Sequence, residues 1–203
     1  MVRTERDRRR RLPAAERRRQ IIAETTALIA ERGFWGLSTQ DVADACGITV
    51  PGLLHHVGSK EALLLEVLTH RDEEDARALA EDLAGQPRRT GVPLLRQMCS
   101  AIVRRNAAAP EVVRLFTVLQ GESLTPTHPA HAYFQRRRRR AVAALADLAS
   151  GHADDPEALA RRLLAMMDGL QIQWLQEPDR VDLVSAWEDA AGGLFGRRAR
   201  RSV

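Results

Sequence analysis

The stretch "GITVPGLLHHVGSKEALL", residues 47–64, decides how the rest of the chain is interpreted. Pro51 and Gly52 stand side by side near its start, and Lys60, the only lysine of the chain, follows two histidines. Proline is tolerated in the first turn of a helix, because the N–H that it lacks would have no partner there. Thr49 is a good N-cap residue. We therefore expect a short helix after Thr49, with a slim first turn.

The residues before this helix predict two further helices. Apolar residues recur at helical spacing over residues 21–29, and Gly33 can end that helix with a positive φ. Ser38, with Asp41 three residues later, predicts a capping box and a helix over residues 39–45. A helix, a tight glycine turn and a second short helix are typical of the helix-turn-helix motif, whose second helix enters the major groove of DNA.

Beyond Ser59, which we expect to cap a longer helix, the apolar pattern stays helical. Further helices are predicted near residues 92–106, 111–121, 130–149, 156–175 and 181–195, and strand-like alternation is not seen. The predicted fold class is all-α. Residues 1–12 are expected to form a disordered basic arm, residues 13–58 a three-helix helix-turn-helix DNA-binding domain, and residues 59–203 a helical bundle for effector binding and dimerisation.

The composition limits the classes of function. Two cysteines, Cys46 and Cys99, make no disulfide framework, so a reducing compartment is expected. The sequence contains neither a signal peptide nor an apolar run long enough for a membrane span, and we expect a cytoplasmic protein. It also contains no nucleophile elbow, P-loop or zinc signature. We therefore expect neither an enzyme nor a cofactor or metal site. His128 and His131, with Glu122 nearby, are candidate metal ligands. The sequence sets no third ligand at a fixed spacing from them, so a metal site is not expected.

Charge is distributed unevenly along the chain. Residues 1–20 contain nine arginines and three acidic residues, a net charge of +6, whereas the whole chain has a net charge of +4. A basic arm on a nearly neutral body suits a polyanion such as nucleic acid. A solubilising tail with no binding role is the alternative, and charge alone does not separate the two. Arg136–Arg140 point all round a helix, which favours a solvated surface with local acidic partners over a second DNA site.

The segment "IIAETTALIAERGFWGLSTQDVADACGITVPGLLHHVGSKEALLLEVL", residues 21–68, resembles the DNA-binding domain of TetR-family transcriptional regulators. The resemblance rests on the ERGF turn, on Ala43–Ile48, and on the L-x-x-H-x-x-S-K-E run at Leu53–Glu61. It departs from the family at Leu54, where a tyrosine is usual, and at Val57, where a phenylalanine is common. By position it implies that Thr39, Gln40, Thr49, Val50, Pro51, Gly52 and His55 face bases or nearby phosphates, and that His56 and Lys60 contact phosphates. Taken singly, His56 could instead be a buried core histidine.

The same resemblance implies a C-terminal domain that binds a small effector and forms a homodimer. A largely apolar effector site is expected from Met98, Ile102, Phe116, Leu119, Gln120, Glu122, Tyr133, Phe134 and Gln171. A dimer interface of two apolar helices is expected from Leu163, Met167, Leu170, Trp174, Val184, Trp187 and Ala191. Ordinary intramolecular core is the alternative for the inward half of each of these helices.

The function that we expect is therefore that of a ligand-responsive transcriptional repressor. It would bind a palindromic double-stranded DNA operator as a homodimer and be released by a small, largely apolar effector. An architectural or constitutive DNA-binding protein without an effector is the alternative.

Overall fold

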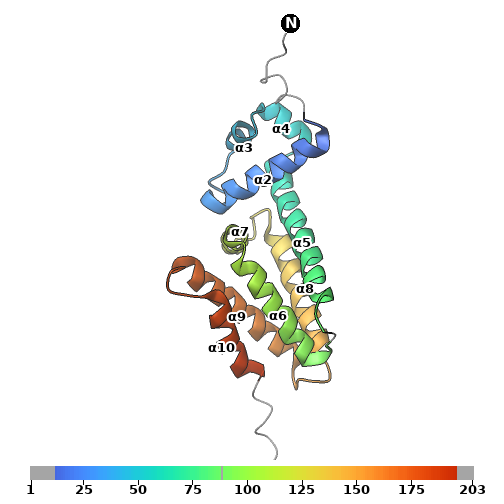
Figure 1. The fold of residues 1–203 in the computed structure, drawn as a ribbon. Helices are drawn as coiled ribbons and strands as arrows, with labels where there is room; N and C mark the ends of the chain where they lie inside the picture. The colour runs from blue at the N-terminus through green and yellow to red at the C-terminus, as the bar shows by residue number, and fades with distance from the viewer. Residues whose placement is uncertain (1–11, 88, 196–203) are drawn as a thin grey trace, which may run out of the picture.

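The computed structural model describes residues 12–87 and 89–195, and within these ranges it contains helices and no strands, as predicted. Three helices, α2 (Ala14–Arg32), α3 (Thr39–Ala45) and α4 (Val50–Val57), form one end of the molecule, at the top of Figure 1. The basic arm predicted over residues 1–12 lies outside the described residues, apart from Leu12.

The first helices begin where their capping residues predict. Ser38 Oγ accepts a hydrogen bond from the Asp41 N–H at 3.1 Å, and the Asp41 carboxylate accepts one from the Ser38 N–H at 2.8 Å, which completes the capping box. Thr49 Oγ1 accepts from the Gly52 N–H at 3.2 Å and so caps α4. Ser59 caps α5 (Lys60–Ala84) in the same way.

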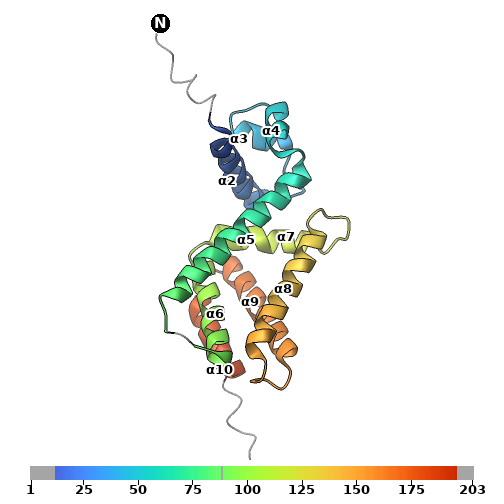
Figure 2. The ribbon, with the colours of Figure 1, turned by 90° about the vertical axis from the view of Figure 1, so that its right-hand side faces the viewer.

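The long helix α5 joins the two parts of the molecule (Figure 2). It contains 25 residues and is therefore roughly 37 Å long, at about 1.5 Å per residue. The remaining helices are α6 (Gly91–Ala107), α7 (Pro110–Glu122), α8 (His131–Ala149), α9 (Pro156–Gln176) and α10 (Leu183–Phe195). Each lies within two residues of its predicted bounds. In both views α7 lies between the first three helices and the other helices of the bundle.

Two hydrophobic cores hold the helices together. The first contains Leu53, Leu64 and Leu68 of α4 and α5, and it also includes Leu115 and Leu119 of α7. The second is built by α6, α8, α9 and α10 around the fully buried Trp187. The first core therefore extends from the helix-turn-helix region into the bundle. Cys46 and Cys99 are free and buried, and no helix in residues 12–87 and 89–195 has the length and hydropathy to cross a membrane.

Candidate functional sites

The first candidate site is the surface formed by α3, the first turn of α4 and the start of α5. Seven of the nine residues predicted to face DNA lie on these elements or cap them, whereas His55 and His56 lie in the last turn of α4; none of the nine is buried. Gly52 keeps the first turn of α4 slim, because a Cβ there would lie 3.2 Å from Thr49 Oγ1, the atom that caps the helix. The surface thus offers a helix N-terminus with small side chains, which is the shape needed for close approach to a groove.

Several of these side chains have partners within the chain. Gln40 Nε2 donates to Asp44 Oδ1 at 2.7 Å. His56 is half-buried and its ring meets the edge of the His55 ring, with centroids 5.8 Å apart, so the alternative of a buried core histidine is wrong. The Lys60 ammonium lies 4.2 Å from the centroid of the buried Phe34 ring. This cation–π contact fixes the lysine beside the N-terminus of α5, whose dipole adds partial positive charge.

Two of the arginines that contribute to the net charge of residues 1–20 are used in packing. Arg17 is buried, and its guanidinium donates to the Cys46 carbonyl at 3.0 Å. Arg18 forms a bidentate ion pair with Glu66 of α5 and donates to the His56 carbonyl at 3.0 Å. These contacts tie α2 to α3, α4 and α5, so the net charge of residues 1–20 overstates what the arm itself has available for a polyanion.

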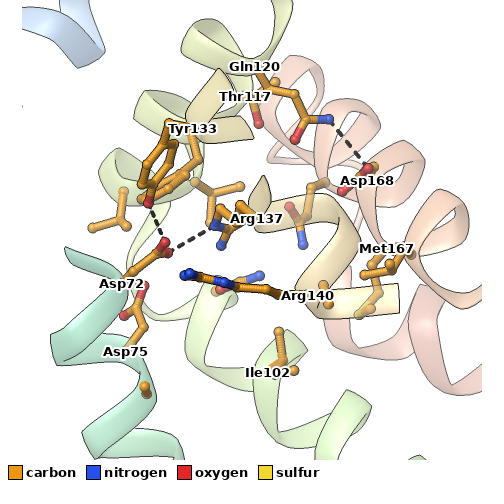
Figure 3. Close-up of a pocket in the computed structure, with 18 of the residues that line it drawn as sticks. Asp72, Asp75, Ile102, Thr117, Gln120, Tyr133, Arg137, Arg140, Met167 and Asp168 are labelled. Atoms are coloured by element: carbon orange, nitrogen blue, oxygen red, sulfur yellow. Dashed lines mark hydrogen bonds and ion pairs between the residues drawn. The ribbon is translucent and has the colours of Figure 1, made fainter. Parts of the chain in front are cut away.

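The second candidate site is a partly open cavity of about 970 Å³ lined by α5, α6, α7, α8 and α9 (Figure 3). This volume is in the range of small-molecule sites. Six of the nine residues predicted for an effector site line it, namely Met98, Ile102, Phe116, Gln120, Tyr133 and Gln171. These six predicted residues therefore share one cavity, and its role as an effector site stays a prediction.

The other three predicted lining residues lie elsewhere. Leu119 and Phe134 are buried in the first core, where they pack with side chains of the first helices instead of facing the cavity. Glu122 lies at the end of α7 and contacts the helix-turn-helix region instead. The prediction that these three line the cavity is wrong.

Charged residues that the sequence analysis missed also line the cavity. Tyr133 donates a hydrogen bond to Asp72, and Arg137 Nε pairs with Asp72 Oδ1 at 2.9 Å (Figure 3). Burial, and then the contact with Asp72, raise the pKa of the Tyr133 phenol well above its ordinary value, so the phenol remains a neutral donor. Arg136 and Arg140 line the cavity as well.

The interpretation of Arg136–Arg140 as a solvated surface is therefore only partly right. Arg137 and Arg138 have the acidic partners expected, Asp72 and Asp168, each at 2.9 Å. However, three of the five arginines line the cavity, so the site is more strongly charged than the predicted, largely apolar one. The signal was present in the sequence, since positions 133, 137 and 140 share one face of a helix.

A contact between α7 and α2 connects the neighbourhood of the cavity to the helix-turn-helix region. Glu122 Oε2 accepts a hydrogen bond from the Phe34 N–H at 3.0 Å, and it lies 3.6 Å from Nε2 of the buried His128. The His128 ring packs edge-on against both Phe34 and Trp35. Burial lowers the pKa of His128, although Glu122 acts in the opposite direction. The end of α7 is thus held against the end of α2 by a small polar and aromatic cluster.

The predicted dimer interface divides into two groups. Leu163, Met167, Trp187 and Ala191 are buried within the protomer, and the Trp187 indole N–H donates to Ser100 Oγ at 2.9 Å. For these four the interface prediction is wrong, because their side chains form the second core. Leu170, Trp174 and Val184 are half-buried in the single chain, and for them it stays a prediction.

No group of three His, Cys, Asp or Glu side chains in residues 12–87 and 89–195 is arranged to hold a metal ion. Glu122 and His128 form a pair, whereas His131 turns its Nδ1 to the Ser123 carbonyl, 2.7 Å away. Their arrangement is that of a structural contact.

Comparisons with known proteins agree with this architecture. Residues 21–67 match the model for bacterial regulatory proteins of the tetR family, and residues 93–194 match that for the C-terminal part of BetI-type transcriptional repressors. The transcriptional regulator BetI of Brucella anthropi is 28% identical over 178 residues, which cover 84% of this chain and 87% of that protein. For two further regulators, from Bacillus subtilis and Rhodococcus jostii, the matched region spans only 26% and 52% of their length.

Solved structures show the same fold. A transcriptional regulator from Pseudomonas aeruginosa PAO1 superimposes with a TM-score of 0.71 and 25% identity, over 98% of this chain and 99% of that one. AibR, solved in complex with isovaleryl coenzyme A and operator DNA, superimposes with a TM-score of 0.67 and 23% identity, over 88% of this chain and 98% of that one. With the helix-turn-helix geometry and both family models matched, the chain belongs to the tetR family of bacterial regulatory proteins.

Proposed function

We propose that this regulator is a cytoplasmic, non-enzymatic repressor that binds operator DNA as a homodimer and is released by a small molecule bound in the cavity. The observation that carries this proposal is the position of α5. Its first residue, Lys60, lies beside α4, and its middle residues Thr69, Asp72 and Asp75 line the cavity. One continuous helix therefore joins the DNA-facing surface to the ligand site.

In this proposal the first turn of α4 enters the major groove. Val50 and Pro51 pack on thymine methyl groups, while Thr49 and Gln40 reach base edges or phosphates. His56 and Lys60 contact phosphates, which position the helix without reading sequence. The exposure of Thr49, Pro51 and His55 supports this orientation. Because Val50 and Gly52 offer no side-chain hydrogen bonds, groove shape contributes to recognition.

The homodimer is proposed to form through α9 and α10. Leu170, Trp174 and Val184 remain partly accessible there. Paired helices of this kind build four-helix interfaces. A two-fold dimer that reads successive major grooves needs its recognition helices roughly 34–36 Å apart.

The effector acts by favouring a different spacing of the two recognition helices. This requires that the ligand bind the released conformation more tightly than the DNA-bound one. By reciprocity, operator DNA must weaken the binding of the ligand by the same factor. The contact of Glu122 with the Phe34 N–H is a second route, beside α5, through which a shift of α7 reaches the helix-turn-helix region.

The test is to select DNA sites from a random pool with the full-length chain and then to titrate the complex with metabolites. We expect a palindromic consensus, two protomers per site, and at least one compound that both raises the unfolding temperature and releases the DNA. A Trp174→Glu variant should sediment as a monomer at micromolar concentration, whereas the control Trp35→Glu, at an exposed position in the turn after α2, should remain a dimer. Tight DNA binding that no stabilising compound weakens would instead identify an architectural protein.

A further inference from the structure

Three of the four acidic residues that line the cavity, Asp72, Asp75 and Asp168, already have a basic neighbour. Asp72 pairs with Arg137 at 2.9 Å, and Asp75 lies 3.7 Å from Arg105 of α6, which it shares with Asp82 at 3.3 Å. Asp168 pairs with Arg138 at 2.9 Å and accepts a longer hydrogen bond from Gln120, at 3.4 Å. A cationic ligand would have to compete with a guanidinium for each of these three carboxylates.

Two arginines of the cavity, by contrast, have no such partner. Arg136 and Arg140 are exposed and form no hydrogen bond or ion pair with the parts of the chain that the structure describes. Figure 3 shows Arg140 reaching across the cavity below Arg137, with no dashed line to it. Among the acidic lining residues, only Glu73 is likewise without a partner. The unpaired charge in the cavity is therefore two guanidinium groups against one carboxylate.

The neighbouring Arg137 is held in place before any ligand binds. Its guanidinium pairs with Asp72 and lies 4.6 Å from the centroid of the Phe116 ring. A planar guanidinium fixed on both sides keeps its remaining N–H donors aimed in a constant direction. Arg137 can therefore support a negative group that Arg140 binds, with little loss of side-chain entropy.

Beyond the arginines the wall of the cavity becomes apolar. Ile102 and Met98 of α6, with Leu164 and Met167 of α9, line this part. Six of the seven charged lining residues thus lie on α5 and α8, and the seventh, Asp168 of α9, pairs with Arg138. Methyl and thioether groups gather on the side of α6 and α9. A ligand that fills the site needs one charged end and one apolar end.

We infer that the effector is an amphipathic organic anion, whose carboxylate or phosphate is bound by Arg140 beside Arg137 and whose hydrocarbon part lies against the apolar wall. This inference rests on the proposed effector role of the cavity and specifies its ligand class. A hydrogen bond to a charged group is stronger than one between neutral groups. An anionic ligand therefore binds more tightly than a neutral one of the same length.

The test compares four probes of equal chain length on the full-length protein without DNA: decanoate, decyl phosphate, decanol and decyltrimethylammonium. Binding is measured by calorimetry and by the shift in unfolding temperature. We expect at least one of the two anions to bind about tenfold more tightly than decanol, and the preferred anion identifies the head group. The inference is overturned if neither anion binds, if decanol binds as tightly, or if the cation binds best.

Two single variants then locate the head group. Arg140→Met removes the charge but keeps an unbranched side chain, and it should lower the affinity for the preferred anion about tenfold while leaving decanol unchanged. Arg139→Met is the matched control, because Arg139 is an exposed neighbour on α8 that does not line the cavity. Equal anion affinity in both variants would refute the role of Arg140.

The same probes separate this inference from the proposed function. Binding is measured without DNA, whereas release is measured on the selected operator. If an anion binds through Arg140 but leaves the operator complex intact, the ligand class stands and the effector role fails. If a neutral compound releases the DNA and no anion binds, the effector role stands and the ligand class is wrong.

Discussion

The contact between Gly33 and Glu122 allows a quantitative test of how the two parts of the molecule are joined. Gly33 has φ 71° and ψ 172°, a conformation that is essentially restricted to glycine. A Cβ at this position would lie 2.5 Å from Glu122 Oε1. Gly33→Ala therefore strains the backbone and also pushes the Glu122 carboxylate away from the Phe34 N–H.

The two costs can be estimated separately. Backbone strain of this kind is about 1–3 kcal/mol. A hydrogen bond to a charged acceptor contributes about 1.5–3 kcal/mol, and we take the lower half of that range because the Glu122 side chain is 20% exposed. Gly33→Ala should therefore lower the free energy of unfolding by about 2.5–5 kcal/mol. In a Glu122→Ala background only the strain remains, so the same substitution should cost about 1–3 kcal/mol.

Urea denaturation of the four proteins of this double-mutant cycle measures the difference, which we expect to be about 1.5–2 kcal/mol. Gly47→Ala is a useful control, because Gly47 also has a positive φ but has open space where a Cβ would lie. If Gly33→Ala costs the same with and without the Glu122 side chain, the contact does not join α2 to α7 energetically, and the argument fails.

Three further predictions follow from the contacts described above. The buried His128 has a lowered pKa, so the unfolded chain takes up its proton more readily; the free energy of unfolding should fall as the pH is lowered through about 6.5. Urea titrations across that pH range should show a weaker dependence for His128→Gln, and an unchanged dependence would contradict the assignment. Lys60→Ala should weaken binding to all DNA sequences alike and lower the salt slope by about one unit per protomer; a loss confined to one base position would show that Lys60 reads sequence. Trp187→Phe removes the hydrogen bond to Ser100 and leaves a small void, and should cost about 1–3 kcal/mol in urea denaturation; a neutral change would show that the hydrogen bond contributes nothing.

Helix bounds were predictable from sequence because helix ends depend on local chemistry. Ser38, Thr49 and Ser59 each cap a helix through a hydrogen bond to a residue three positions later. Such contacts need no knowledge of the rest of the fold. The helix-turn-helix surface was predictable for the same reason, since all of its residues lie between positions 39 and 60.

The residues that line the cavity, and those that would form the dimer interface, were less predictable. Their positions depend on how each helix is rotated about its own axis. Leu119 and Phe116 are three residues apart on α7, yet one is buried in the first core and the other lines the cavity. Trp187 belongs to an apolar stripe that would suit either an interface or a core. Only the partner helices of the folded chain decide between such alternatives.

The extension of the first hydrophobic core into α7 limits how this regulator can be recombined with its relatives. A chimera that takes residues 12–58 from this chain and the remainder from another regulator would have foreign side chains in place of Leu115 and Leu119, both of which are fully buried against the donated helices. Packing mismatches at such positions typically cost several kcal/mol. A biosensor that exchanges DNA specificity between regulators therefore needs to transplant the matching face of α7 together with the first helices. Natural shuffling of recognition modules faces the same constraint. Under the proposed function, operator specificity should therefore change more easily by surface substitution on α3 and α4 than by exchange of the whole module.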